Sequence, residues 1–375
     1  MLTRLYLDNF RCFENFEFKP GPLQVILGAN GTGKSSFVDA LRFLRRFIVD
    51  GVALDDLRPL SQRTRWLRKA KQTFEIEVQL GGQSFRYRLE IEAKGNPARA
   101  RVGSESLIAD GEVVFAFENG VVTRYPPTKS GGKIPRQGRA SGIAEALGST
   151  RDVSYEADDR RSALATSPHR FKTWFENLYC FRLDPFRMGS RAPSEALHPA
   201  PDLSNIAAWY RGVGLAFRRE DKTLLRSLAD SIDGFEFLRF QPIGEGVSVL
   251  QAEFARTGKF NFKELSDGQR CLIALYMILH FIVAKGGAVV IDEPENFISL
   301  REIQPWLMSV RDAAEEAKGQ ILLISHHPEI MNQWAPENGV LFVRDETGAV
   351  SPAELPVDPD SALTVSELIA RGWEN

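Results

Sequence analysis

Residues 28–35 read Gly28-Ala29-Asn30-Gly31-Thr32-Gly33-Lys34-Ser35, and this octapeptide matches every fixed position of the pattern GxxxxGK[ST]. A compact apolar run, Val25-Ile26-Leu27, comes directly before it. After it, apolar residues recur at spacings of three and four from Phe37 to Ile48, which is typical of a helix buried on one face. The sequence therefore predicts a glycine loop between a buried strand and a helix, the context in which this pattern binds phosphate.

The residue types in this loop suit a nucleoside triphosphate. Glycines let several backbone N–H groups turn towards one phosphate chain without Cβ clashes, and the following helix presents its positive end to the same anion. Lys34 supplies a cation for the β- and γ-phosphates, and the Ser35 hydroxyl is placed to coordinate Mg²⁺. We therefore expect ATP and Mg²⁺ as cofactors, and the expected nucleotide-binding residues are Gly28, Asn30, Gly31, Thr32, Gly33, Lys34, Ser35 and Ser36.

A second apolar strand ends in two carboxylates, in the run Ala288-Val289-Val290-Ile291-Asp292-Glu293. By itself, such a run is most often a buried strand that leads into a solvated turn. Beside a phosphate loop, Asp292 at the strand end can hold the magnesium ion, and the next carboxylate, Glu293, can orient the attacking water. We predict Ser35 and Asp292 as the metal-binding residues.

The segment Leu265-Ser266-Asp267-Gly268-Gln269-Arg270 begins a helix, with Ser266 as the expected N-cap. One interpretation is a helix start and nothing more. The other is a signature motif that lies shortly before the magnesium strand, because Ser266 precedes Asp292 by 26 residues and this leaves room for one helix and a turn.

Taken together, the motifs resemble those of ABC-type ATPase heads of the RecF/SMC lineage, specifically the bacterial ATPases related to the overcoming-lysogenisation-defect (OLD) proteins. The residues that carry the resemblance occur in the family's order: Asn9-Phe10-Arg11, the phosphate loop, Leu265–Arg270, Asp292-Glu293-Pro294-Glu295-Asn296 and Ser325-His326-His327-Pro328. The resemblance implies an α/β P-loop NTPase fold with a mainly parallel core sheet, an antiparallel β subdomain and a helical insertion.

The resemblance also implies roles for individual residues. Arg11 would lie near the nucleotide, Glu293 would be the catalytic base, and His326 would contact the γ-phosphate. Ser266, Gly268 and Gln269 of the signature would complete the γ-phosphate site of a second subunit, since a helix N-terminus with Ser and Gly amides binds such an anion well. Residues 296–299 would form the loop that communicates across this dimer.

Some positions depart from relatives or allow another interpretation. Asp267 stands where transporters have glycine, and no glutamine of a Q-loop can be located, with 181–185 as the only candidate segment. Two adjacent histidines after a strand could also be a helix cap or a metal pair, and we interpret His327 as structural. Cys271 is expected to be a small core residue.

Composition sets limits on the class of protein. The 375 residues are 43% hydrophobic and 26% charged with a net charge of −2, which is ordinary for a globular protein. The three cysteines lie far apart and form no CxxC pair, so neither a disulfide scaffold nor a cysteine zinc site is expected. No apolar run approaches the length of a membrane span, and the N-terminus lacks the layout of a signal peptide. A cytoplasmic location and no membrane partner are expected.

Charge is distributed unevenly along the chain. Between Arg42 and Lys71 there are nine basic and three acidic residues. Such a block is usually solvated surface, and the alternative is DNA contact through segment 42–71.

The chain is expected to form a single ATPase head over 1–375. Residues 1–50 would form an N-terminal lobe, 72–125 an antiparallel β subdomain of two hairpins, 126–232 a mobile loop and helical insertion, and 233–375 a C-terminal lobe. Strand and helix alternate at both chain ends, so one parallel sheet assembled from the two ends is predicted, with 340–343 among its strands. Only 48 residues follow His327, which is too few for a C-terminal TOPRIM domain.

These observations favour a Mg²⁺-dependent ATPase that binds and hydrolyses ATP at a head-to-tail homodimer interface. ATP would act as a switch for DNA repair or antiviral defence, and a separate nuclease-like or TOPRIM-like partner would carry the effector activity; the biological process rests on family analogy alone. The alternative function is a slowly hydrolysing nucleic-acid sensing module that recruits a partner. A transporter's ATP subunit is disfavoured, because the antiparallel insert and the Phe10-Arg11 start resemble DNA-maintenance heads.

Overall fold

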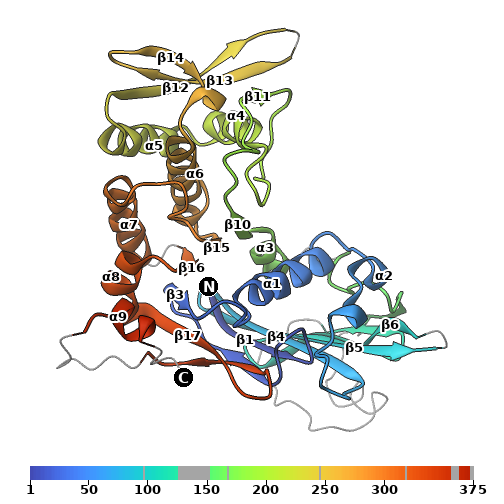
Figure 1. Ribbon diagram of the computed structural model, residues 1–375. Coiled ribbons are helices and arrows are strands. Elements are labelled where there is room, and N and C mark those ends of the chain that lie inside the picture. The colour runs from blue at the N-terminus through green and yellow to red at the C-terminus, as the bar shows by residue number, and fades with distance from the viewer. Residues whose placement is uncertain are drawn as a thin grey trace. The chain divides into compact units, whose positions relative to one another are not determined.

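The computed structural model describes residues 1–95, 98–125, 153–166, 169–244, 246–316, 319–355 and 363–371. The chain groups into two compact units (Figure 1). Unit 1 comprises Met1–Gly21, Gly28–Glu176 and Leu341–Ala353, and unit 2 comprises Pro22–Leu27, Asn177–Val340 and Glu354–Asn375. The chain passes between the units several times, so each unit is assembled from segments far apart in sequence.

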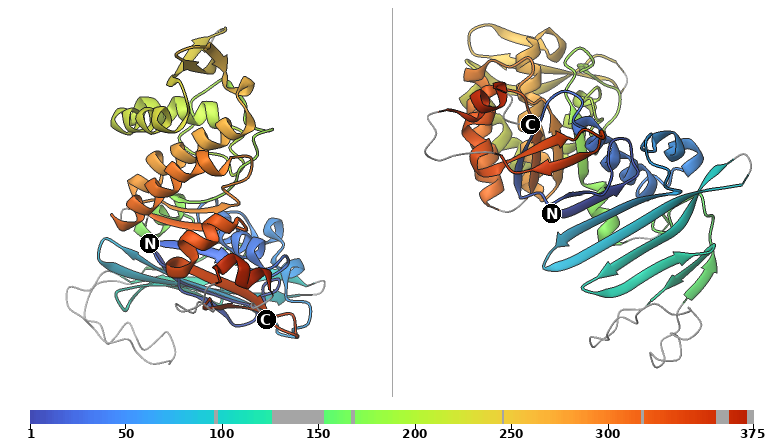
Figure 2. Two further views of the ribbon diagram at one scale, coloured as in Figure 1. Left: turned by 60° about the vertical axis from the view of Figure 1, so that its left-hand side comes forward. Right: turned by 60° about the horizontal axis from the view of Figure 1, so that its bottom comes forward.

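Unit 1 is built on one antiparallel sheet of eight strands in the order β2-β1-β4-β5-β6-β7-β8-β9. The long strands at its centre lie side by side in the right-hand view of Figure 2. The strands are β1 (Leu2–Asp8), β2 (Phe16–Phe18), β4 (Lys71–Leu80), β5 (Gln83–Lys94), β6 (Arg99–Ala109), β7 (Glu112–Glu118), β8 (Val121–Arg124) and β9 (Val153–Glu156).

Helices cover the apolar side of this sheet. Alternate residues of β4 and β5 are buried, as expected for strands with one solvated face. Phe43 of α1 (Lys34–Ile48) stacks on Phe74 of β4 with ring centroids 5.0 Å apart, and Phe171 of α3 (Arg170–Glu176) stacks on Tyr87 of β5. Two short helices, α2 (Leu54–Leu57) and η1 (Pro59–Gln62), follow α1.

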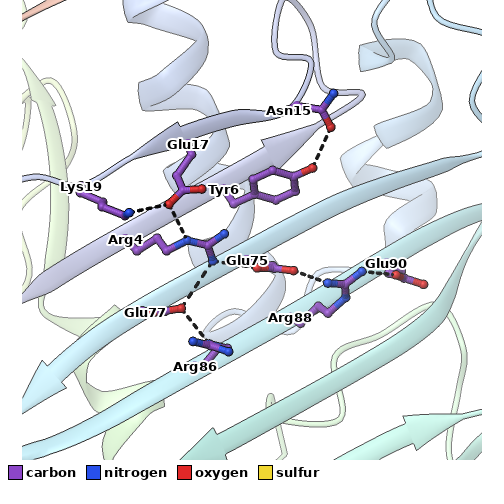
Figure 3. Close-up of polar contacts among 10 residues, drawn as sticks. All are labelled: Arg4, Tyr6, Asn15, Glu17, Lys19, Glu75, Glu77, Arg86, Arg88 and Glu90. Atoms are coloured by element: carbon purple, nitrogen blue, oxygen red, sulfur yellow. Dashed lines mark hydrogen bonds and ion pairs between the residues drawn. The ribbon is translucent and has the colours of Figure 1, made fainter. Parts of the chain in front are cut away.

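The opposite side of the sheet carries a network of ion pairs (Figure 3). Arg4 of β1 reaches Glu75 of β4 at 2.7 Å, and Arg86 of β5 reaches Glu77 at 2.7 Å. Arg88 also pairs with Glu75. The charges alternate across neighbouring strands and cancel locally. The glutamates of β4 are partly buried and the arginines of β5 are exposed, so this side of the sheet is an electrically balanced surface.

Unit 2 contains a parallel sheet of four strands in the order β10-β15-β16-β3. These are β10 (Leu178–Arg182), β15 (Ala288–Asp292), β16 (Gln320–Ile324) and β3 (Leu23–Leu27). The helices α6 (Asp267–Phe281), α7 (Leu300–Glu315) and α8 (Pro328–Asn338) pack around it, with α7 against β16 and α8 against β3. Because the strands are parallel, their carboxyl ends meet at one edge.

A second layer of unit 2 is antiparallel. It consists of β11 (Arg191–Ala192), β12 (Phe235–Pro242), β13 (Ser248–Phe254) and β14 (Gly258–Asn261), with α4 (Ile206–Ala216) and α5 (Arg218–Ser231). Helix α5 contacts both β12 and α6. The turns η2 (Phe262–Glu264) and η3 (Val283–Lys285) flank α6. By length and composition, Asp267–Lys285 could cross a membrane, but 72% of it is buried inside the protein, as in the core helix of a globular unit.

The structure confirms the predicted strand, loop and helix around Gly28–Ser35, the strand before Asp292, and the parallel pairing of N- and C-terminal strands. The other strand predictions have different outcomes. The strands of 72–125 are antiparallel, as predicted, and β4 pairs with β1, so they belong to one sheet with β1 and β2. They also include β6, in which Glu105 occupies a buried position and breaks the apolar alternation. The predicted strand at 340–343 is observed as part of β17 (Gly339–Arg344), which belongs to the same sheet as β3 and pairs antiparallel with β18 (Val350–Ala353).

The prediction of a helical segment from 171 to 232 is wrong in part. It contains β10, because the four-residue apolar run Leu178–Phe181 is too short for its periodicity to distinguish a strand from a helix. The predicted mobile loop lies mainly at 126–152, outside the described residues, and β9 follows it. A last helix, α9 (Val365–Ala370), contacts α8.

Candidate nucleotide-binding site

The glycine loop adopts backbone conformations that side chains disfavour. Gly28, Gly31 and Gly33 all have positive φ, at 139°, 86° and 89°. A Cβ on Gly28 would lie 2.6 Å from the carbonyl oxygen of Phe342, and a Cβ on Gly33 would lie 2.8 Å from Sγ of Cys12. Both glycines are therefore required by conformation and by space.

The side chains of the loop are ordered by the loop itself. The Lys34 ammonium is buried and donates to the carbonyl oxygens of Gly28 and Ala29, at 2.5 and 2.9 Å. The Thr32 hydroxyl donates to the same Ala29 carbonyl oxygen. Ser35, in the first turn of α1, is exposed. The loop thus encloses the Lys34 ammonium and leaves the Ser35 hydroxyl exposed.

Arg11 is fixed against the same helix. It has a positive φ of 53°, and its Nη1 lies 2.7 Å from Oδ2 of Asp39. Asp39 follows Ser35 by one helical turn, and residues four apart share a helix face. The preceding Asn9 is fully buried and bonds the backbone of Lys69 and Lys71 through its side-chain amide. The Asn9-Phe10-Arg11 segment therefore places an arginine beside the first turns of α1.

The two predicted carboxylates lie at the edge of the parallel sheet in unit 2. Asp292 ends β15, in register with Arg182 of β10 and Ile324 of β16. Glu293 follows with φ 53° and donates its backbone N–H to the Ile324 carbonyl oxygen. Its Oε2 accepts a hydrogen bond from Nδ2 of Asn296 at 2.8 Å.

The histidine pair follows β16 and is held by Glu295. Oε1 of Glu295 accepts from the Ser325 hydroxyl at 2.7 Å and from the backbone N–H of His326 at 3.3 Å. His326 is exposed, whereas the Nδ1 of His327 accepts from the N–H of Glu329 and caps α8. The structural interpretation of His327 is confirmed.

The predicted N-cap of α6 is also confirmed. The Ser266 hydroxyl accepts from the backbone N–H of Gln269, and the Gln269 side chain accepts from the N–H of Ser266, which makes a reciprocal capping box. Asp267 pairs with Arg270 within the first turn. Cys271 is fully buried, as expected, and burial raises the pKa of its thiol to about 12.

The start of α6 is packed closely against the loop that follows the carboxylates. A Cβ on Gly268 would lie only 2.7 Å from the carbonyl oxygen of Phe297. The buried guanidinium of Arg270 donates to the carbonyl oxygen of Pro185, and Phe186 meets Phe297 edge to face, with ring centroids 5.8 Å apart. Three segments of unit 2, around residues 185, 268 and 297, are thereby held together.

The predicted site residues fall into two groups. Unit 1 holds Arg11, Gly28, Asn30, Gly31, Thr32, Gly33, Lys34, Ser35 and Ser36, and unit 2 holds Ser266, Gly268, Gln269, Asp292, Glu293 and His326. Chain continuity relates the groups, because Gly28 directly follows β3 and β3 belongs to the parallel sheet of unit 2. The strand between β3 and β15 is β16, which precedes the histidines.

Three polar residues of this edge were not predicted as site residues: Arg182, Glu295 and Asn296. Glu295 and Asn296 lie within the quoted motif, so their proximity to Glu293 was a usable signal. Arg182 lies in the segment 181–185 that was the only Q-loop candidate, but the strand that it ends was not predicted.

The residues present fit ATP and Mg²⁺. The glycine loop leaves open space beside Gly31, where a Cβ would meet no atom within 4 Å. A serine hydroxyl and an aspartate are the oxygen donors that Mg²⁺ prefers, and this ion is usually completed by phosphate oxygens and water. Within the described residues no three His, Cys, Asp or Glu side chains form a metal cluster.

Comparison with known proteins defines the class. The fold is that of SMC heads, and the phosphate loop is that of a P-loop ATPase. The chain belongs to the family described as "AAA domain, putative AbiEii toxin, Type IV TA system", which matches residues 23–332.

The relatives found are distant in sequence. An OLD nuclease of Thermus scotoductus is 46% identical over 41 residues, which are 11% of this chain and 8% of that protein. The match therefore spans only a small part of the relative's length. The SMC head bound to the C-winged-helix domain of ScpA has a TM-score of 0.56 at 14% identity, covering 94% of this chain and 97% of that chain.

A second solved structure gives the same result. The SMC head with an extended coiled coil from Pyrococcus furiosus, bound to the C-terminal domain of ScpA, has a TM-score of 0.55 at 11% identity. It covers 100% of this chain and 98% of that chain. At these identities the likeness establishes the fold, which agrees with the predicted ABC-type head.

Proposed function

We propose that the protein is a cytoplasmic Mg²⁺-dependent ATPase that binds and hydrolyses ATP at a head-to-tail homodimer interface. ATP acts as a switch for dimer closure, and a separate nuclease-like or TOPRIM-like partner carries out the effector step in antiviral defence or DNA repair. Membership in a P-loop ATPase family supports nucleotide binding. The dimer, the partner and the biological process are parts of the proposal.

The observation that carries the proposal is the composition of one sheet edge. Strands β15 and β16 end in Asp292-Glu293 and Ser325-His326, and β3 leads directly into the glycine loop. A phosphate cradle, a metal-binding carboxylate, a second carboxylate and a histidine thus follow neighbouring parallel strands. In this arrangement Glu293 orients the attacking water, His326 contacts the γ-phosphate and Asp292 with Ser35 holds Mg²⁺.

The signature residues support a role in a second subunit's site. Ser266 and Gly268 stand at the N-terminus of a 15-residue helix, and the helix amides and dipole favour an anion there. Arg11, beside α1, contributes positive charge near the nucleotide. Solved SMC heads carry a bound ScpA domain, which supports a search for a protein partner of this head too.

The alternative function, a slowly hydrolysing module that senses nucleic acid, is favoured by one observation. Of the nine basic residues at 42–71, four pair with carboxylates: Arg42, Arg45, Lys69 and Lys71. Arg65 and Arg68 are exposed, and no described residue forms an ion pair with either. These two arginines can therefore meet phosphates without breaking an existing contact.

Turnover and dimer formation test the proposed function directly. Lys34→Ala removes the phosphate-binding cation and is expected to abolish ATP binding and hydrolysis with the fold intact. Glu293→Gln is expected to bind ATP, to hydrolyse it at least about 100-fold more slowly, and to accumulate as a dimer on a sizing column with ATP and Mg²⁺. Wild-type turnover in both variants would refute the ATPase. A monomeric Glu293→Gln variant at saturating ATP would refute dimer gating.

A further inference from the structure

We infer that Arg182 is a positioning residue for the carboxylate of Glu293. Its charge lies beside the carboxylate oxygen that Asn296 hydrogen-bonds, which leaves the other oxygen for the attacking water. This inference rests on the proposed function, because it assigns Arg182 a task only if Glu293 acts on water.

The contact itself lies at the end of two neighbouring strands. Nη2 of Arg182 lies 3.8 Å from Oε2 of Glu293, and the same Oε2 accepts the Asn296 hydrogen bond at 2.8 Å. Among the described residues, Oε1 of Glu293 accepts no hydrogen bond. A general base needs one oxygen within reach of the water and the other held in place, and this carboxylate has that asymmetry.

Both backbones in this contact are fixed. Arg182 ends β10 in register with Asp292, and its N–H donates to the carbonyl oxygen of Pro201 at 3.1 Å. Glu293 has a left-handed backbone, which is uncommon for a residue with a side chain, and its N–H is bonded to Ile324. The sheet therefore fixes the backbone positions of both residues.

The positive charge of Arg182 also offsets an electrostatic repulsion at this edge of the sheet. A carboxylate placed beside a triphosphate is repelled by it, and a guanidinium next to the carboxylate offsets this repulsion. The side chain of Arg182 is 68% exposed and its separation from Glu293 is longer than a hydrogen bond. Its N–H donors therefore remain accessible while its charge stays beside the base.

Arg187 provides a matched control. It lies five residues further on, its side chain is 65% exposed, and its Nη1 pairs with Oδ2 of Asp202 at 2.8 Å. It is thus a similarly exposed arginine whose carboxylate partner is Asp202 and not Glu293.

Steady-state ATP hydrolysis by the full chain tests the inference. Arg182→Ala is expected to lower kcat about 100-fold, with the dissociation constant for ATP, measured by titration, changed less than about threefold because the loop residues are untouched. Guanidinium chloride at millimolar concentration is expected to restore part of the activity of this variant, and Arg187→Ala should hydrolyse ATP at the wild-type rate. Arg182→Lys keeps the charge but not the planar fork and is expected to retain intermediate activity, which preserves the test if the alanine variant fails to fold.

A double-mutant comparison separates the inference from the proposed function. In the Glu293→Gln background, Arg182→Ala is expected to cause no further loss, because residues that act as a unit are non-additive. Wild-type kcat for Arg182→Ala, or a full additional loss in the Glu293→Gln background, would overturn the inference while leaving the ATPase intact. Wild-type turnover by Glu293→Gln alone would instead overturn the proposed function.

Discussion

The carbonyl oxygen of Phe297 occupies the space beside Gly268 that a Cβ would need, at 2.7 Å from the Cβ position. This contact joins the first turn of α6 to the loop after Glu293, both within unit 2. Phe297 itself has a φ of 72°, so the loop accepts backbone strain to make the contact. Any movement of the loop around Phe297 must therefore change the packing at the start of α6.

Replacement of Gly268 by alanine tests this coupling. The added methyl group would meet a backbone oxygen, which cannot rotate away, so we expect a loss of about 1–3 kcal/mol in the free energy of unfolding. Hydrolysis should fall at least about tenfold, because the loop that carries Asn296 is displaced from Glu293. Chemical denaturation and ATP turnover measure the two effects. Gly244→Ala, where a Cβ would meet no atom within 4 Å, is the control and should change neither quantity. Unaltered stability and turnover in Gly268→Ala would show that the loop accommodates the methyl group.

A bulky cation at Ser266 tests the role of the signature in a second subunit. Ser266→Arg is expected to leave ATP binding by the monomer nearly normal and to abolish ATP-dependent dimer formation, as measured by sizing in the Glu293→Gln background. Loss of the N-cap alone costs about 1 kcal/mol, and Ser266→Ala controls for it because it removes the cap without adding bulk. If the arginine and alanine variants dimerise as well as Glu293→Gln, the signature has no role across the interface.

The exposed arginines of segment 42–71 allow a sharper test of DNA binding than the sequence did. Within segment 42–71, Arg63 is less suitable than Arg65 and Arg68, because its guanidinium donates to the backbone carbonyl of Ala70 and it is partly buried. We expect weak, sequence-independent binding that falls steeply between about 50 and 200 mM salt. Arg65→Glu/Arg68→Glu should abolish this binding and leave ATP binding unchanged.

The control for this experiment must carry the same charge change elsewhere. Arg218 and Arg219 are exposed at the start of α5 in unit 2, and their replacement by glutamate should leave DNA binding intact. Fluorescence anisotropy with a labelled duplex measures both variants. An equal loss of DNA binding in the two double variants would indicate an effect of net charge. If the wild type does not bind DNA at about 50 mM salt, segment 42–71 has no role in DNA binding.

The predictable parts of the molecule were those with strong local signals. The phosphate loop, the strand before Asp292 and the Ser266 cap each combine residue identity with a periodicity or a cap pattern, and the structure places all three as expected. The cap on His327 was anticipated from its position after β16.

The remainder depended on pairing between distant segments. No local sequence pattern shows that β1 pairs with β4, which begins about sixty residues later. Likewise, none shows that Leu178–Phe181 pairs with β15. Buried polar residues added to the difficulty. Glu105 accepts hydrogen bonds from Tyr87, Ser162 and Ala163, and these partners become visible only in three dimensions. The same holds for Arg182, whose relation to Glu293 follows from strand register.

A half-buried histidine of unit 2 predicts how stability depends on pH. His280 of α6 bonds the Ser227 hydroxyl of α5 at 3.0 Å through Nε2 and stacks on Tyr276. Burial lowers the pKa of His280 from 6.5 to about 4. Between these two pH values the His280 side chain binds a proton in the unfolded chain but not in the folded protein. The unfolded state is therefore stabilised relative to the folded state as the pH falls.

We therefore expect His280 to destabilise the protein progressively from about pH 6.5 down to pH 4, with a loss of about 2 kcal/mol in the free energy of unfolding at pH 5. His280→Gln keeps an amide that can bond Ser227 but does not titrate, and it should remove this part of the pH dependence. Urea unfolding of both proteins at pH 7, 6 and 5 measures the difference. From pH 7 to pH 5, the free energy of unfolding of the wild type should fall by about 2 kcal/mol more than that of the variant. Parallel pH profiles would show that His280 is protonated in the folded protein and that the helix pair α5–α6 admits water around it.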